Sequence, residues 1–242
     1  MPPPRSLARA ASFRPPQDWR VVHQRLEAYR RSLRDLPPDV ALARSRHLSV
    51  DNETRRFHCL VRLMLSSMTH GSASTAAVTQ LMDHELTPSS VQRMGEAGLK
   101  KHISCVNFHH RKAAHISQVA DILLREYGGK VPREYNQLLA LPGVGPKVAN
   151  LFFLVADDRV VGIGVDTHVH RVSQRLGWVP KTVKSPEDTR KALESWLPRE
   201  HWANVHFTLV TLGKRVCAAQ SPQCAVCVAK DSCPSAFQVQ RK

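Results

Sequence analysis

The sequence predicts an all-α protein, and three features of the chain support this expectation. From Trp19 onward, apolar residues recur at helical spacing in most segments. Short breaks rich in proline or glycine separate these segments. Only residues 160–165 read as a β-strand, and one short strand cannot build a sheet.

Amphipathic helices account for most of the chain. The clearest covers residues 53–68, where an apolar stripe begins at Phe57, passes through Met64 and places Met68 in the core. A second stripe occupies residues 116–127 and ends at two consecutive glycines, which commonly stop a helix. The other predicted helices, in chain order, cover residues 19–36, 72–84, 89–99, 133–141, 146–156, 167–176, 185–197 and 201–214.

Composition narrows the class of partner. A chain of 242 residues with 42% hydrophobic content can bury one sizeable core or two smaller ones. Its 35 lysines and arginines outnumber 20 acidic residues, which gives a formal net charge of +15. Such a charge suits a polyanionic partner, above all nucleic acid, although a solvated basic surface gives the same composition. No apolar run reaches the roughly 18 residues of a membrane-spanning helix, so we expect a soluble protein without a membrane partner.

The first 17 residues differ in composition from the rest of the chain. They carry three arginines and no acidic residue, and they are rich in alanine, proline and serine. This composition predicts a disordered basic arm or an organelle transit segment. The prolines at positions 2–4 and 15–16 oppose the amphipathic helix that mitochondrial import requires.

Residues 141–147 lie between two predicted helices and predict a tight hairpin. Gly143 and Gly145 allow a turn that brings bare backbone amides to the surface, and Pro146 fits the first turn of the next helix. Amides at such a turn, backed by the positive end of a helix dipole, can hold a phosphate without reading the base sequence. An ordinary glycine-containing connection is the alternative. The candidate nucleic-acid contacts are Leu141, Gly143, Val144, Gly145 and Lys147.

Lys147 and Asp166 are candidates for a shared reaction. Lys147 begins the helix after the hairpin, and both a helix N-terminus and partial burial disfavour the charged form of an amine, which must be uncharged to attack a substrate. Asp166 stands immediately before another predicted helix, where aspartate commonly caps the helix. If Asp166 faces Lys147, its carboxylate can accept the lysine proton or stabilise a cation that develops on a sugar. The alternatives are a surface phosphate contact and a simple cap.

Four of the six cysteines lie close together near the C-terminus in a C-x6-C-x2-C-x5-C pattern, as Cys217, Cys224, Cys227 and Cys233. Four thiolates on one short loop can surround either a tetrahedral zinc ion or an iron–sulfur cluster. The spacing does not choose between the two. Disulfides are less favoured, because a basic chain suited to nucleic acid points to a reducing compartment.

Three of these motifs together resemble the endonuclease III family of DNA repair enzymes. They are residues 141–150, residues 165–171 and the cysteine quartet, and the likeness extends from about Phe57 to Cys233. Residues 184–187 and 196–200 resemble the family's eukaryotic branch. The resemblance implies a monomer with an all-α, two-lobed helix-hairpin-helix DNA glycosylase fold. The implied parts are a six-helix barrel lobe over residues 49–159, an iron–sulfur cluster lobe joining residues 18–48 to residues 160–236, and a tail at residues 237–242.

The resemblance also implies a chemistry. Lys147 is implied to be the nucleophile, Asp166 the essential acid, and the four cysteines the ligands of a 4Fe-4S cluster. The implied activity is that of a bifunctional DNA glycosylase and AP lyase acting on damaged double-stranded DNA. Having both the lysine and the cysteine quartet separates this chain from related glycosylases that have only one of them, and it points to oxidised pyrimidines as substrates.

The chain departs from the family pattern at a position that contacts DNA. Where the family usually has Ser-Gln-Thr, this chain has Ser67, Met68 and Thr69, followed by His70. Met68 cannot make the hydrogen bonds of glutamine, but an apolar side chain can act as a wedge between bases. Packing of Met68 in the core stripe is the alternative. Met68 and His70 are therefore candidate DNA contacts whose effect on lesion range is open.

A second departure is the absence of charge in residues 218–223, between the first two cysteines of the quartet. We expect fewer phosphate contacts from this loop. Nearby basic residues, each by default a solvated surface charge, are candidates to replace them: Arg111, Lys112, Lys214 and Arg215.

Two other functions fit parts of the sequence. One is a DNA-binding or damage-sensing iron–sulfur module that has lost efficient turnover, although retention of both Lys147 and Asp166 argues against it. The other is a zinc-bound structural domain. We expect localisation to the nucleus, the mitochondrion or both in a eukaryote, and otherwise to the cytoplasm with the nucleoid.

Overall fold

A computed structural model of the protein describes residues 13–33, 51–69 and 71–238. Every regular element in these ranges is helical, so the predicted all-α fold is confirmed, and residues 160–165 form no strand. Most of the predicted N-terminal arm, much of residues 18–48, and His70 lie outside the described residues. The elements are α1 (Trp19–Ser32), α3 (Asn52–Ser66), α4 (Gly71–Met82), α5 (Pro88–His102), α6 (His109–Glu126), α7 (Tyr135–Leu139), α8 (Pro146–Ala156), α9 (Thr167–Arg175), α10 (Pro186–Glu194), α11 (Trp202–Arg215) and the 3-10 turns η1 (Arg199–His201), η2 (Cys224–Val226) and η3 (Lys230–Ser232).

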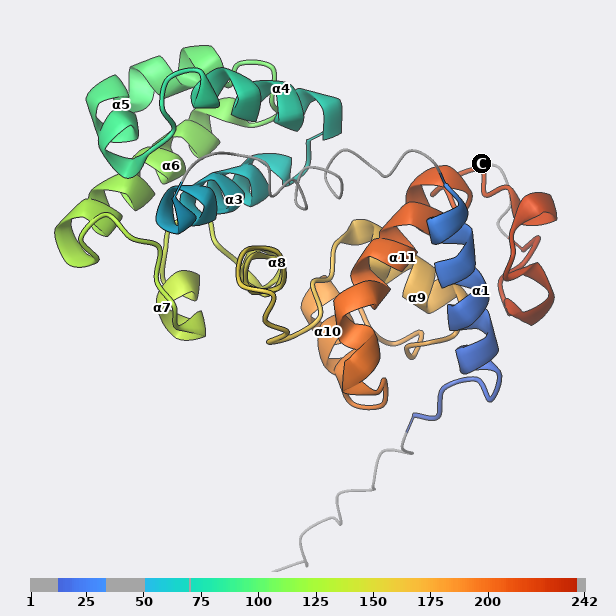
Figure 1. The fold of residues 1–242 in the computed structure, drawn as a ribbon. Coiled ribbons are helices and arrows are strands. Elements are labelled where there is room, and N and C mark those ends of the chain that lie inside the picture. The colour runs from blue at the N-terminus through green and yellow to red at the C-terminus, as the bar shows by residue number, and fades with distance from the viewer. Residues whose placement is uncertain (1–12, 34–50, 70, 239–242) are drawn as a thin grey trace, which may run out of the picture.

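Two separate hydrophobic cores divide these helices into two lobes (Figure 1). The first lobe consists of α3 to α8. Phe57, Leu60 and Leu65 of the predicted stripe on α3 are at most 1% exposed. Helix α8 is buried along nearly its whole length, because residues 148–153 all lie in the interior. The hairpin at the start of α8 therefore rests on a fixed helix.

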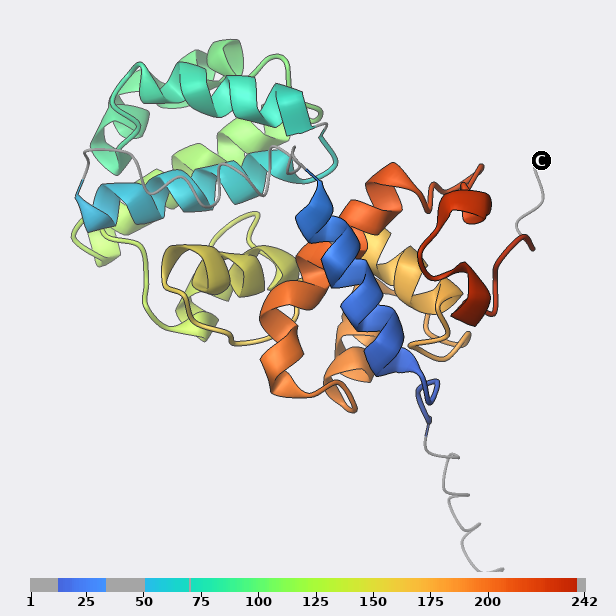
Figure 2. The same ribbon diagram turned by 45° about the vertical axis from the view of Figure 1, so that its right-hand side comes forward.

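The second lobe joins segments that are far apart in the sequence. Helix α1 packs alongside α11, and α9 packs on the same helix (Figure 2). Their shared core includes Leu26 from α1, Val169 from α9 and Leu209 from α11. The four cysteines follow α11 and lie at the edge of this core. None of the helices in the described residues is long and apolar enough to cross a bilayer.

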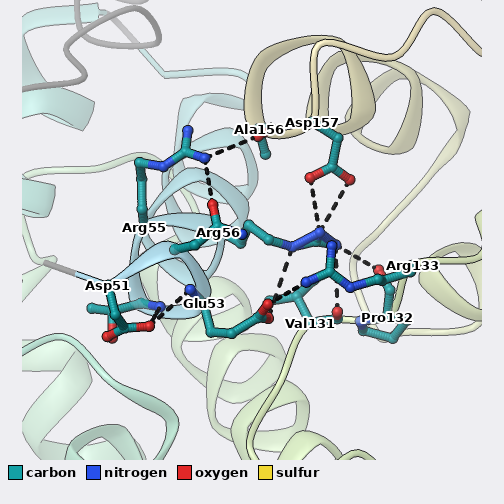
Figure 3. Close-up of polar contacts among 11 residues, drawn as sticks. Asp51, Glu53, Arg55, Arg56, Val131, Pro132, Arg133, Ala156 and Asp157 are labelled. Carbon is teal, nitrogen blue, oxygen red and sulfur yellow. Dashed lines mark hydrogen bonds and ion pairs between the residues drawn. The ribbon is translucent and has the colours of Figure 1, made fainter.

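A buried arginine fixes the far end of α8 to the start of α3 (Figure 3). The side chain of Arg56 is fully buried, and its Nη1 donates hydrogen bonds to Oδ1 and Oδ2 of Asp157 at 2.8 and 3.1 Å. Its Nη2 donates to the carbonyl oxygen of Pro132 at 2.9 Å. Glu53 pairs with Arg133 beside it. This network ties α3, the segment before α7 and the end of α8 together, and so fixes the direction in which α8 points.

Several helices end earlier than the sequence predicted, α3 and α1 among them. Helix α3 stops at Ser66, because Ser67 has an extended backbone and Met68 a left-handed one with φ of 53°. The Met68 side chain is 72% exposed, so its assignment to the core stripe was wrong. Once the chain leaves the helix, the helical spacing no longer turns this side chain toward the core. Helix α1 likewise ends before Leu33, whose backbone is extended.

Candidate active site and cysteine pocket

The predicted hairpin connects α7 to α8. Gly143 has a φ of +76°, and a Cβ atom at this position would lie 2.6 Å from Nδ1 of His115. Both the backbone conformation and the available space therefore require glycine. Gly145 precedes α8, and Pro146 is its first residue, as predicted. Gly143 is exposed and Gly145 is half-buried, so the backbone of the turn reaches the surface.

Leu141 and Val144 occupy the inner side of this hairpin. Their side chains are 4% and 7% exposed and belong to the first core. The backbone N–H of Val144 donates a hydrogen bond to the carbonyl oxygen of Leu141 at 3.1 Å, which closes the turn. The hairpin thus anchors itself through Leu141 and Val144 and presents Gly143 and Gly145 outward.

Lys147 lies near enough to Asp166 to affect its charge state, although the two residues belong to different lobes. Lys147 is half-buried in the first turn of α8. Asp166 caps α9 as predicted, because its Oδ1 accepts a hydrogen bond from the Val169 amide at 2.8 Å. Burial by itself raises the pKa of Asp166, but the charges of His206 and Lys147, together with that amide, outweigh it and lower the pKa below its ordinary 3.8. Asp166 is therefore a charged carboxylate near the Lys147 amine at neutral pH.

His206 on α11 is a site residue that the sequence reasoning missed. Its side chain is 6% exposed, and its Nδ1 lies 2.7 Å from the carbonyl oxygen of Gly164. Burial of Asp166 works in the opposite direction, but His206 is the strongest of the influences that lower the Asp166 pKa. The sequence feature that could have revealed His206 is a histidine within a helix that was predicted to pack on the core.

Met68 and Phe108 are two large apolar residues that are exposed at the surface. Both are exposed, 72% and 53%, and both have left-handed backbones, which cost a non-glycine residue about 1 kcal/mol or more. Asn107 joins them, because its Nδ2 donates to the carbonyl oxygen of Met68 at 2.8 Å. The guanidinium of Arg111 lies 5.5 Å from the centre of the Phe108 ring. Phe108 was not predicted, and its only sequence signal is a lone aromatic residue among polar neighbours.

Lys112 does not lie on the surface, so its prediction as a solvated phosphate contact was wrong. The residue is 8% exposed, and its Nζ donates to the carbonyl oxygens of Leu65 and Ser67 and to Oγ1 of Thr69, each at 2.7 Å. The sequence could not reveal this, because its acceptors lie more than 40 residues away along the chain. The other three predicted surface charges are exposed, namely Arg111, Lys214 and Arg215.

The four cysteines line one pocket in the second lobe, together with apolar residues of α9 and α11 such as Val172 and Leu212. Burial raises the pKa of Cys227 and Cys233, and the neighbouring cysteines raise it further. Among the described residues, no group of three His, Cys, Asp or Glu side chains is arranged to hold a single metal ion.

Helix α9 links the cysteine loop to Asp166. Arg175, in its last turn, donates from Nη1 to Sγ of Cys217 at 3.2 Å and to the carbonyl oxygen of Ala218 at 2.7 Å. Arg171, one turn earlier, donates from Nη2 to the Cys217 carbonyl oxygen at 3.0 Å. One short helix therefore carries Asp166 at its N-terminus and holds the cysteine loop with two arginines.

A two-lobed helical fold with a surface hairpin, a lysine just after it and a carboxylate near that lysine defines the class of helix-hairpin-helix DNA glycosylases. A comparison with protein families agrees, since the model of the HhH-GPD superfamily base excision DNA repair proteins matches residues 61–199. Solved structures agree as well. The fold matches a trapped endonuclease III–DNA covalent intermediate with a TM-score of 0.78 and 28% identity, over 92% of this chain and 97% of that one.

Sequence relatives identify the family more closely. The chain is 40% identical to endonuclease III-like protein 1 of Gallus gallus, over 91% of this chain and 79% of that protein. It is 43% identical to the endonuclease III homolog of Encephalitozoon cuniculi, over 76% of this chain and 81% of that protein. The chain therefore belongs to the endonuclease III family. It is a base excision repair enzyme of the DNA glycosylase and AP lyase type, and its partner is DNA.

Proposed function

We propose that this protein removes oxidised pyrimidines from duplex DNA and cleaves the resulting abasic site by β-elimination, with Lys147 as the nucleophile and Asp166 as the essential acid. The single observation that carries the proposal is the charge interaction between these two residues across the lobes. A covalently trapped endonuclease III–DNA complex among the structural relatives supports a covalent mechanism.

The chemistry follows from the two side chains. The uncharged Lys147 amine attacks C1′ of the damaged nucleotide, the C1′–N bond breaks, and the departing base takes a proton from water. Asp166, held as a carboxylate, stabilises the positive charge that develops on the sugar and receives the proton that the lysine nitrogen loses. The C1′–O4′ bond then breaks, O4′ takes the proton that Asp166 received, and a Schiff base forms between C1′ and the lysine nitrogen. The Schiff base acidifies the C2′ hydrogen, and removal of that hydrogen expels the 3′ phosphate, which cuts the strand on the 3′ side of the lesion.

DNA is held by backbone and by apolar contacts. The amides around Gly143 and Gly145 bind a phosphate at the N-terminus of α8, where the helix dipole is positive. Met68 enters the space that an extruded nucleotide leaves, and its 72% exposure supports this role over core packing. Phe108 joins it as a second apolar contact, because it is exposed beside the same turn.

The cysteine pocket holds a 4Fe-4S cluster in this proposal. Its donor set fits that group, because four thiols meet in a pocket lined largely by apolar side chains, and Arg175 already donates to Cys217 Sγ. The cluster supplies structure to the second lobe or senses DNA, and the base-removal chemistry is left to Lys147 and Asp166. Iron and sulfide in the brown purified protein would agree with this, whereas zinc in a colourless protein would contradict it.

The lobe boundaries and the location in the cell belong to the same proposal. A barrel lobe at residues 49–159 and a cluster lobe at residues 18–48 and 160–236 agree with the membership of the two cores. Action in the nucleus, the mitochondrion or both is consistent with the relatives, which include proteins of animals, plants and fungi.

The decisive test uses duplexes that hold one thymine glycol or one abasic site, with and without borohydride. We expect strand cleavage and a covalent protein–DNA adduct with borohydride. Lys147→Gln should abolish the adduct, whereas Lys130→Gln, which removes an exposed lysine outside the site, should leave it unchanged. Robust trapping by the Lys147→Gln protein would remove Lys147 from the nucleophile role. Binding of lesion DNA without any cleavage by the wild type would favour the damage-sensing function.

A further inference from the structure

Lys112 is a buried lysine that the proposed reaction does not use. It lies in the first turn of α6, and its Nζ donates hydrogen bonds to three oxygens at 2.7 Å each, two of them on Leu65 and Ser67 and the third on Thr69. An ammonium group has three N–H bonds, so these acceptors occupy all of its donors. Lysine is rarely buried unless it is paired in this way.

The three acceptors belong to the end of α3 and to the turn that carries Met68. The last carbonyl groups of a helix have no partner within the helix, and Lys112 satisfies the one at Leu65. On the other side of the turn, Asn107 donates to the Met68 carbonyl oxygen. The left-handed backbone of Met68 is thus held from two directions by residues in and just before α6.

The positive charge of Lys112 lies near that of Lys147, which follows the hairpin. Burial, together with the nearby charges of Lys147 and Arg111, lowers the pKa of Lys112 to about 8. The three oxygen acceptors select the protonated amine, because a neutral amine has only two N–H bonds to donate. Lys112 is therefore close enough to Lys147 for their positive charges to repel, while its hydrogen bonds hold the Met68 turn.

From this geometry, and resting on the function proposed above, we propose that Lys112 is a positioning residue that fixes the Met68 turn and so assists extrusion of the damaged nucleotide. It does not touch the reacting atoms. Substitution of Lys112 should therefore slow the reaction on duplex DNA, where the nucleotide must leave a base-paired stack. The reaction on single-stranded DNA should be affected least, because extrusion costs least there.

The test compares two rates in the intact, cluster-bearing protein. One is thymine glycol removal from duplex DNA, and the other is β-elimination at an abasic site in single-stranded DNA. We expect Lys112→Met, which keeps the length of the side chain, to lower the ratio of the first rate to the second by about ten-fold or more, because buried carbonyls lose their donor. Thr69→Val, which removes one acceptor and keeps the charge, should lower the ratio by a smaller factor.

Two further measurements separate positioning from general damage to the fold. In a Met68→Ala background, Lys112→Met should lower the ratio no further, because both substitutions remove the same wedge. Lys130→Met, on an exposed lysine, should leave the ratio unchanged. An unchanged ratio with Lys112→Met, or independent losses in the double variant, would overturn the proposal. If Lys112→Met does not fold, an unchanged ratio with Thr69→Val overturns it instead. A wild type that is inactive on both substrates would contradict the proposed function itself.

Discussion

In the proposed function, Asp166 has two tasks that can be separated at the level of the residue. Its Oδ1 accepts a hydrogen bond from the Val169 amide, which is the task of a helix cap. Its negative charge interacts with Lys147 and His206, which is the task of a catalytic carboxylate. Asparagine retains an oxygen that can cap a helix but carries no charge. Asp51 offers a comparison, since it caps α3 in the same way from an exposed position.

We therefore expect Asp166→Asn to keep most of the stability and to lower kcat on the order of a hundred-fold, because the developing positive charge loses its carboxylate. Asp51→Asn should alter neither quantity noticeably. Thermal melting and single-turnover kinetics on thymine glycol duplexes measure the two effects. Equal activity of wild type and Asp166→Asn would reduce Asp166 to a helix cap.

The lowered pKa of Asp166 also predicts a pH dependence. A carboxyl group whose pKa in the folded state lies below its unfolded value stabilises the fold at every pH above the unfolded value. This stabilisation is lost as the pH falls below the ordinary 3.8 and through the folded value. Protonation of Asp166 should therefore lower the stability of the protein only in acid, and the Asp166→Asn protein should show a weaker acid-induced loss of stability than the wild type.

At the scale of elements, the Arg56 network decides how α8 is oriented. The guanidinium is completely buried, and Asp157 is its ionic partner at the end of α8. Removing Asp157 leaves the buried charge with only the longer ionic contact to Glu53, 4.0 Å from Nε to Oε2, which is far more costly than losing an exposed ion pair. The hairpin at the other end of α8 depends on this anchor.

Asp157→Ala is therefore expected to lower the free energy of unfolding by about 3 kcal/mol or more. Glu126→Ala, which removes the exposed pair with Arg125, should lower it by less than about 1 kcal/mol. Urea denaturation of both variants gives the comparison. Equal and small effects would mean that the carbonyl oxygen of Pro132 and the other acceptors hold Arg56 without Asp157.

At the scale of the whole molecule, DNA binding depends on both lobes and on the large positive charge of the chain. The chain has a formal net charge of +15, and the catalytic candidates come from both lobes. Phosphate neutralisation by lysine and arginine releases counterions, which makes DNA affinity depend on salt.

We expect the affinity for lesion-bearing duplex DNA to fall by roughly a hundred-fold between about 50 and 200 mM salt. Lys214→Gln should reduce the slope of log affinity against log salt, because this exposed lysine lies in the last turn of α11, just before the cysteine loop. Fluorescence anisotropy over a salt series measures both. A flat dependence would argue against an interface dominated by phosphates.

The sequence by itself determined the fold class, the boundaries of α8 and the local chemistry of the motifs. Helical spacing and the proline at the start of α8 act within one or two turns, so they can be recognised without a structure. The cap at Asp166 is equally local. The grouping of Cys217 to Cys233 was also visible in the spacing.

Only the tertiary structure decided which of these residues meet. The exposure of Met68, the burial of Lys112 and the influence of His206 on Asp166 all depend on helices that approach from distant parts of the chain. Local spacing carries no information about such contacts, because they form when two separate cores are assembled and the burial of apolar surface selects the packing.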